Sequence, residues 1–114
     1  SCLIRFRDGR RVEGSVVNGQ PHGSATMFYA SGDRYVGEWV EGTKHGSGSF
    51  FSATGDLYRG EWNKDARHGN GEEHCIDGSS YFGSFQRDRR EGQGQLLVPG
   101  PSTPKFFLLN VLTR

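Results

Sequence analysis

Aromatic residues and glycines alternate with polar residues along the middle of the chain. Tyr58, Gly60 and Trp62 are each separated by one polar residue, and side chains two positions apart on a β-strand point to the same face. A second strand, beginning near Gly48, would place Phe50 on that face as well. No stretch before the C-terminal end has a sustained apolar pattern of helical period. We therefore predict an all-β chain.

The same pattern recurs every 23 residues. The unit that begins at Tyr58 is preceded by one at Tyr35 and by a degenerate copy at Val12, and a fourth begins at Tyr81. A period of this length is typical of a repeat array. Glycine-containing hairpin turns follow the same period, at Asp8-Gly9, Ser31-Gly32, Thr54-Gly55 and Asp77-Gly78. Each unit is predicted to be a strand, a longer loop, a second strand and a short turn.

Pairing the strands gives the glycines a structural role. A hairpin closed around Thr54-Gly55 would set Phe50 opposite Gly60 and Gly48 opposite Trp62. Large rings would then face residues with little or no side chain, which makes room for the rings. The residues expected to form the repeat core are Tyr35, Gly37, Trp39, Tyr58, Gly60, Trp62, Tyr81, Gly83 and Phe85.

The chain divides into three predicted parts. Residues 1–98 would form an array of about four repeats that starts in the middle of a repeat, so we expect a piece of a longer protein. Residues 99–104 form a Pro- and Gly-rich linker that is not expected to continue the sheet. The exposed edge at the end of such an array must be covered. Residues 105–114 are apolar, and we predict that they act either as a short C-terminal cap or as a dimerisation segment.

The pattern YxGEW, followed by HGxG, in 23-residue units resembles the MORN repeat (membrane occupation and recognition nexus). The Tyr35 and Tyr58 units match it closely, whereas the Tyr81 unit has Ser84-Phe85 in place of Glu-Trp and Glu91 in place of His. The resemblance implies stacked antiparallel hairpins in one elongated, twisted and often grooved sheet. It also implies a non-catalytic function: binding of protein partners, self-assembly or contact with phospholipids.

Composition and charge exclude little but agree with this interpretation. The chain has 114 residues, of which 18 are glycine, eight Phe, four Tyr and two Trp. The aromatic residues recur at fixed intervals, which disfavours a disordered chain. A net charge of +1 points to neither nucleic acid nor membrane as a bulk partner. Two distant cysteines favour a reduced setting, so we expect a cytoplasmic protein, which could be associated with the cytoskeleton or a membrane.

Candidate reactive groups do not converge. His22, His45 and His68 would lie two strands apart, about 10 Å, whereas the nitrogens that bind one metal ion each lie near 2.1 Å from it. We expect these histidines, like Glu38 and Glu61, to fix loops. No catalytic residue, cofactor, metal ion or small-molecule substrate is predicted.

Two sets of residues are candidates for binding. The first lies on the sheet face opposite the Tyr and Trp residues, where apolar side chains need a cover: a loop of the chain, the C-terminal segment, a second copy or a partner's helix. Its members are Phe28, Val36, Phe51, Arg59, Phe82 and Leu97, with His74 beside them.

The second set is a basic ladder, defined as Lys44, Arg67 and Arg90, with Lys64 and Arg87 nearby. It could bind anionic phospholipid headgroups, or it could be a solvated loop edge balanced by neighbouring acids. The sequence thus favours a non-catalytic scaffold that binds a peptide, a helix or a second copy through its aromatic faces. A phospholipid-binding module and a regulatory arm of a larger enzyme are the alternatives.

Overall fold

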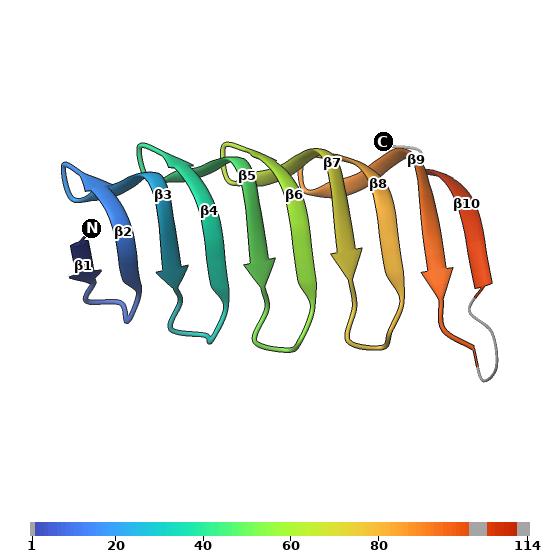
Figure 1. Ribbon diagram of the computed structural model, residues 1–114, viewed down its shortest axis with the longest axis horizontal. Helices are drawn as coiled ribbons and strands as arrows, with labels where there is room; N and C mark the ends of the chain where they lie inside the picture. The colour runs from blue at the N-terminus through green and yellow to red at the C-terminus, as the bar shows by residue number, and fades with distance from the viewer. Residues whose placement is uncertain (1, 101–104, 112–114) are drawn as a thin grey trace.

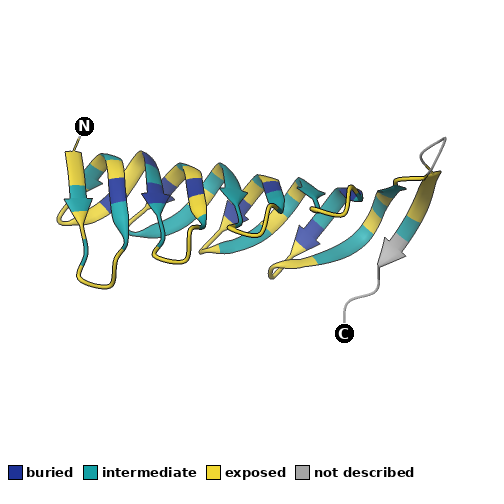
Figure 2. Cartoon of the chain, turned by 90° about the horizontal axis from the view of Figure 1, so that it is seen from below, coloured by how far each residue is buried: buried dark blue, intermediate teal, exposed yellow. Residues whose placement is uncertain are grey.

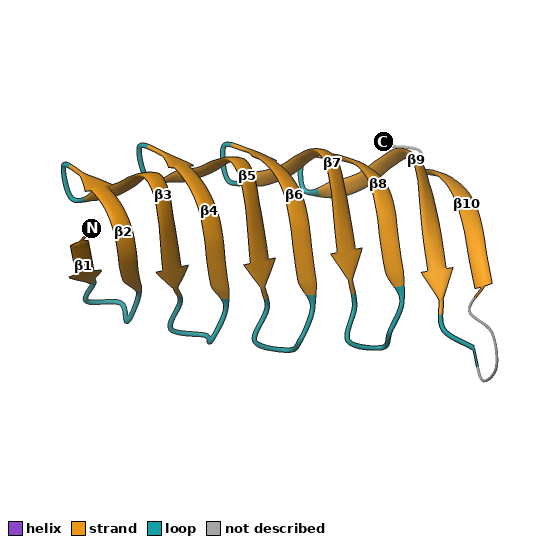
Figure 3. Ribbon diagram, in the orientation of Figure 1, coloured by secondary structure: helices purple, strands orange, loops and turns teal. Residues whose placement is uncertain are grey.

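The computed structural model describes residues 2–100 and 105–111. They form one antiparallel sheet whose ten strands follow chain order (Figures 1 and 3). No helix occurs in these residues. The strands are β1 (Cys2–Arg5), β2 (Arg11–Val17), β3 (Gln20–Phe28), β4 (Arg34–Val40), β5 (Thr43–Phe51), β6 (Leu57–Asn63), β7 (Ala66–His74), β8 (Ser80–Gln86), β9 (Arg89–Val98) and β10 (Lys105–Val111). The predicted all-β hairpin array is confirmed.

The connection between β4 and β5 is a two-residue turn, so the prediction of a longer loop after Trp39 is wrong. Glu41 and Gly42 have φ angles of 47° and 83°, both left-handed, as in the tight turns that suit the twist of a β-hairpin. Trp39 already pairs with Lys44. The stretch from Thr43 to Gly48, expected in a loop, is therefore the first part of β5.

The connection between β5 and β6 is longer than expected and shifts the register. Ser52 N–H donates to Asp56 O (2.9 Å), Gly55 N–H donates to Ser52 O (3.0 Å), and Gly55 has a φ of 103°. This is a three-residue loop that ends on a left-handed glycine, one of the common hairpin loops.

The resulting pairs differ by two residues from the predicted ones. Phe50 lies opposite Tyr58, Gly48 opposite Gly60, and Trp62 opposite Gly46. The hairpin before it has the same correction: the equivalent prediction sets Met27 opposite Gly37, whereas Ala25 lies there. A shift of two leaves every side chain on its predicted face, so the face assignment holds although the partners were wrong.

Glycines form a row across the sheet, and the strands bend there. Gly37, Gly48, Gly60, Gly71, Gly83 and Gly94 are successive partners. An added Cβ on Gly60 would come within 2.6 Å of Gly71 Cα and 2.7 Å of Tyr58 Oη. Each repeat also has a β-bulge beside this row, as between Gly37 and Trp39, and bulges bend strands. Figure 1 shows the upper parts of the strands curling over, which makes the sheet a trough.

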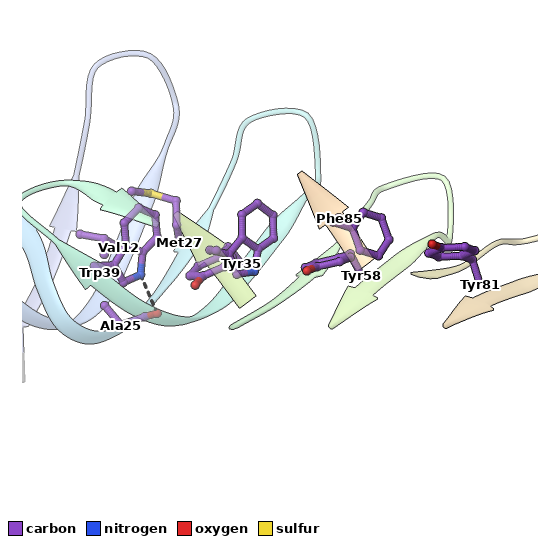
Figure 4. Close-up of a cluster of buried hydrophobic side chains, with 9 residues drawn as sticks. Val12, Ala25, Met27, Tyr35, Trp39, Tyr58, Tyr81 and Phe85 are labelled. Carbon is purple, nitrogen blue, oxygen red and sulfur yellow. Dashed lines mark hydrogen bonds between the residues drawn. The ribbon is translucent and has the colours of Figure 1, made fainter. Parts of the chain in front are cut away.

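The core lies inside the trough, in a single chain of aromatic contacts. Tyr35, Trp62, Tyr58, Phe85 and Tyr81 meet edge to face in that order, with ring centroids 5.0–5.3 Å apart, and Trp39 extends the chain from Tyr35 at 5.0 Å. All six are at most 6% exposed. Figure 4 shows Trp39, Tyr35, Tyr58, Phe85 and Tyr81 following one another along the array, and the buried positions run from Val12 on β2 to Phe85 on β8 (Figure 2). A single-layer sheet thus makes its core by folding over its own aromatic face.

The sheet continues past the predicted end of the array. β10 pairs with β9 over its whole length, from Lys105 opposite Val98 to Val111 opposite Gly92. Phe106 and Leu108 are 65% and 84% exposed. Only the linker was expected not to continue the sheet, and its residues 101–104 lie outside the described residues. Whether 105–114 acts as a cap or in dimerisation stays a prediction.

Candidate functional site

A groove of about 360 Å³ lies on the Tyr and Trp face, over β5, β6 and β7. Its lining includes Ser52 and Asp56 from a lower loop and Asp65 and Asp88 from two upper turns. These residues belong to opposite ends of the strands, and they face one cavity because the strands bend between them. We call this cavity the groove; its full lining is Lys44, Phe50, Ser52, Asp56, Leu57, Tyr58, Trp62, Asp65, Arg67, Glu73 and Asp88.

Aromatic rings give the groove its apolar surface. Phe50 lies 6.3 Å from Trp62, centroid to centroid, and Trp62 contacts both Tyr35 and Tyr58. Trp62 is held in place by its indole N–H, which donates to Gly48 O at 3.2 Å. Phe50 is only partly buried, so part of its ring is available to a ligand.

Lys44 enters this face surrounded by rings. Its Nζ lies 5.3 Å from the Trp62 centroid, 5.7 Å from Tyr35, 5.9 Å from Trp39 and 6.0 Å from Tyr29. Asp65 Oδ1 is 3.4 Å away, and the lysine side chain is 14% exposed. Several rings and a carboxylate around one ammonium group form a favourable cation–π site, which the chain fills with its own lysine.

Arg67 and Arg90 occupy the equivalent positions in the next two repeats. Both contact Glu73, at 3.1 Å and 2.8 Å respectively, and Arg67 Nε also lies 2.7 Å from Asp88. Glu73 stands where Phe50 stands one repeat earlier, so a charged network replaces the ring at this level. The predicted basic ladder is thus a real row, but it lies inside the trough and faces carboxylates rather than a loop edge.

The remaining members of the predicted basic set lie elsewhere. Lys64 and Arg87 are exposed at the first positions of two upper turns, with φ angles of 49° and 50°. The groove lining itself contains four acids, Asp56, Asp65, Glu73 and Asp88, against two cations, Lys44 and Arg67. The groove is therefore acidic in balance as well as aromatic.

Burial perturbs the tyrosines beneath the groove. It raises the pKa of Tyr58 to about 12, and it also raises the pKa of Tyr35 and of Tyr81. Tyrosine hydroxyls are protonated at neutral pH even without this shift, and here they act as donors. Tyr58 Oη donates to Glu61 O (2.9 Å) and Tyr35 Oη to Glu38 O (3.1 Å), which ties each ring to the bend of its own strand.

The predicted partner-binding residues lie on the outer face, away from the groove. Phe28, Phe51 and Leu97 belong to one row across the strands, and Val36, Arg59 and Phe82 belong to the next. Arginines stack on Phe28 and Phe51, whereas Val36 is 41% exposed. The structure gathers these residues on one surface, and their binding role stays a prediction.

Phe50 and the acidic lining were not among the sequence candidates. The sequence did place Phe50 on the Tyr and Trp face, and its 23-residue series Met27, Phe50, Glu73 and Leu96 changes chemical character from unit to unit. This position faces inward in each unit, but its residue type differs between units. That combination is the sequence feature that could have indicated the groove. Asp65 and Asp88 were expected only as acids that balance the basic ladder at a solvated loop edge, because the upper segments were expected in loops.

Among the predicted loop-fixing groups, Glu38 and Glu61 bind backbone within strands β5 and β7, whereas His22 binds a turn. Glu38 Oε2 accepts from Ser47 N–H and Glu61 Oε2 accepts from Asn70 N–H, both at 2.8 Å. His22 Nδ1 accepts from Glu41 N–H at 3.1 Å. Across residues 2–100 and 105–111, no three His, Cys, Asp or Glu side chains are placed to hold a metal ion.

A membrane-crossing helix is not found in the part of the chain that the structure describes.

Ten strands built from 23-residue hairpin units, with a bent glycine row and an internal aromatic core, define a β-class repeat protein with an open trough. The family model for the MORN repeat matches residues 13–34, 35–57, 58–80 and 81–97, which is most of the chain, and the chain belongs to the MORN-repeat family. Three of these boundaries coincide with the repeats predicted from Tyr35, Tyr58 and Tyr81. A comparison with curated proteins finds no match.

Proposed function

We propose that this chain is a non-catalytic protein-interaction scaffold whose groove holds a segment of a partner protein. The observation that carries the proposal is the combination, in one 360 Å³ cavity, of a partly exposed Phe50 ring with an acidic balance of charge. Apolar anchors in a pocket provide most of the affinity at protein interfaces, and charges around them provide specificity.

The lining defines the chemistry of the occupant. A large apolar side chain would contact Phe50 and Trp62, and Lys or Arg residues beside it would face Asp56, Asp65 and Asp88. The lining runs from the lower loop between β5 and β6 to the upper turns, so an extended or helical segment fits better than a bulky folded loop. We therefore expect a short basic and apolar peptide segment.

Anionic phospholipid headgroups are a weaker candidate for this face. Lys44 lies near Asp65, and Arg67 and Arg90 share Glu73. An anionic headgroup would have to compete with these carboxylates in a groove that is already acidic in balance. This arrangement supports binding of a protein segment in preference to lipid.

The test selects peptides from a random library on the full chain and then measures their affinity for two matched variants. Phe50→Glu removes the apolar wall, and it copies the arrangement in which Glu73 stands beside Arg67 and Arg90, so the fold should persist. Phe51→Glu places the same charge on the outer face.

We expect selected peptides to combine an aromatic or aliphatic residue with Lys or Arg, and to bind Phe50→Glu about tenfold more weakly, the loss typical of a buried anchor. Phe51→Glu should bind them like the parent chain. Equal affinity for Phe50→Glu and the parent would refute the groove as the binding site.

A further inference from the structure

The outer face of the sheet carries a row in which arginine and phenylalanine alternate, just above the lower loops. Successive strand partners place Arg5 beside Arg11, Arg11 beside Phe28, Phe28 beside Arg34, and Arg34 beside Phe51. We call these five residues the Arg/Phe row. It spans β1 to β5 and lies on the face opposite the groove.

Two of the three arginines in this row stack on rings, and among the described residues none of the three has an ion-pair partner. The guanidinium carbon of Arg11 lies 4.2 Å from the Phe28 centroid, and that of Arg34 lies 4.3 Å from the Phe51 centroid. Among the described residues, neither these two nor Arg5 has a carboxylate within ion-pair distance, whereas Arg59 and Arg10 do. Arg11 Nε is buried and makes no hydrogen bond to any of those residues.

A stacked guanidinium is well prepared to bind an anion. The ring covers one face of the guanidinium group. The N–H groups point outward within the guanidinium plane and can form a two-pronged contact with a carboxylate. Stacking also restricts the side chain before any partner arrives, which lowers the entropic cost of binding.

The spacing of the row selects the shape of the partner. Adjacent strands lie about 4.8 Å apart, so Arg11 lies about 5 Å from Arg5 and about 10 Å from Arg34 along the array. A helix rises 1.5 Å per residue, so acidic residues roughly three and ten positions after a first one would meet the three arginines in turn. Apolar residues between and beyond them would meet Phe28 and Phe51.

We propose that the Arg/Phe row binds an acidic amphipathic helix of a partner protein, lying along the length of the trough. Charge complementarity supports this occupant, because the row offers three cations without acidic partners among the described residues. A flat anionic surface fits less well, since the arginines form a single line. The groove would hold one partner and the outer face another, so the chain would act as a two-sided adaptor.

The test uses a fluorescent Ala-rich helical peptide with Glu at a first position and roughly three and ten positions later, and Leu at the positions facing Phe28 and Phe51. A peptide with Lys in place of Glu serves as the ligand control. Arg11→Gln with Arg34→Gln is compared with Lys64→Gln and Arg89→Gln, which removes the same charge from exposed sites at the upper ends of the strands. Circular dichroism checks that all variants are folded.

We expect the Arg11/Arg34 variant to bind the acidic peptide at least about tenfold more weakly, because two charge-assisted contacts are lost. The Lys64/Arg89 variant should change by less than about twofold, and Phe50→Glu should bind normally even if the groove proposal fails. The proposal is overturned if the parent chain does not bind the peptide, if both arginine pairs weaken it equally, or if the Lys peptide binds as well. It is also overturned if Arg11→Gln with Arg34→Gln abolishes pelleting with phosphatidylserine vesicles while peptide affinity is unchanged.

Discussion

At the scale of single residues, the fold depends on pairing three of the four tyrosine rings with bare backbone. Tyr35 lies over Gly48, Tyr58 over Gly71 and Tyr81 over Gly94, and a Cβ on any of these glycines would meet the ring. Gly48, Gly71 and Gly94 do not have left-handed φ angles. They are needed for space, whereas Gly55 is needed for its conformation.

Gly48→Ala should therefore destabilise the protein although alanine tolerates the backbone angles there. The Tyr35 ring would have to move out of a packed chain of aromatic contacts, which costs about 1–3 kcal/mol, the usual range for overpacking. Urea denaturation would measure the loss in unfolding free energy. Ser49→Ala, one residue along on the outer face, should change it by less than about 0.5 kcal/mol, and equal effects would contradict the explanation.

The buried hydroxyl of Tyr58 makes stability depend on alkaline pH. Its pKa is raised from 10.0 to about 12 by burial, so folding favours the neutral form. The associated stability is fully present below pH 10 and is lost as the pH rises from about 10 to about 12, with a total near 2 kcal/mol. Tyr58→Phe should flatten this part of a curve of unfolding free energy against pH, and an unchanged slope would argue against burial as the cause.

At the scale of elements, the sequence predicts faces better than connections. Alternation at two residues and the 23-residue period were enough to place Tyr35, Trp39 and Phe50 on one face. The register was not predictable from the Thr54-Gly55 signal alone, because loops of two and three residues share that signal and differ in pairing. Two of the upper turns gave no signal, because Lys64-Asp65 and Arg87-Asp88 adopt left-handed angles without any glycine, whereas Glu41-Gly42 was assigned to a longer loop despite its glycine.

The same error displaced part of the candidate site. With residues 43–48 assigned to a loop, Lys44 was expected at a loop edge, whereas pairing with Trp39 places it on the aromatic face. Its spacing relative to Arg67 and Arg90 was predicted correctly. What surrounds them could not be predicted, because it depends on the bend of the strands at the glycine row.

Those left-handed turn positions offer a simple stabilisation. Lys64 and Arg87 hold φ angles of 49° and 50°, which asparagine adopts more readily than most residues. Lys64→Asn combined with Arg87→Asn should raise the unfolding free energy by about 1 kcal/mol, measured as a rise in melting temperature. The control is Arg89→Asn, because Arg89 is exposed and its φ is not left-handed. This substitution should not raise the unfolding free energy.

At the scale of the whole molecule, the array extends 48 Å in its longest dimension and each strand contacts chiefly its two neighbours. Stability in such a molecule is approximately a sum over units and their interfaces. The unit from Tyr58 to Ser80 can be removed in phase, because Leu57 would then precede Tyr81 as Ser80 does now.

Deletion of residues 58–80 should give a folded chain shortened by two strands, about 10 Å. Small-angle scattering would show the shorter particle and circular dichroism its retained sheet. The groove would lose Tyr58, Trp62 and Glu73, so peptides selected on the parent chain should no longer bind. An unfolded deletion variant would contradict the modular description.

The groove proposal is tested most directly by the two indole N–H signals of the protein in a nuclear magnetic resonance titration with a selected peptide. Trp62 lines the groove, whereas Trp39 does not and its indole donates to Ala25 O at 3.0 Å. We predict that the Trp62 signal shifts progressively with added peptide and the Trp39 signal shifts far less. An unmoved Trp62 signal, with shifts confined to the backbone of Phe28 and Phe51 on the outer face, would contradict it.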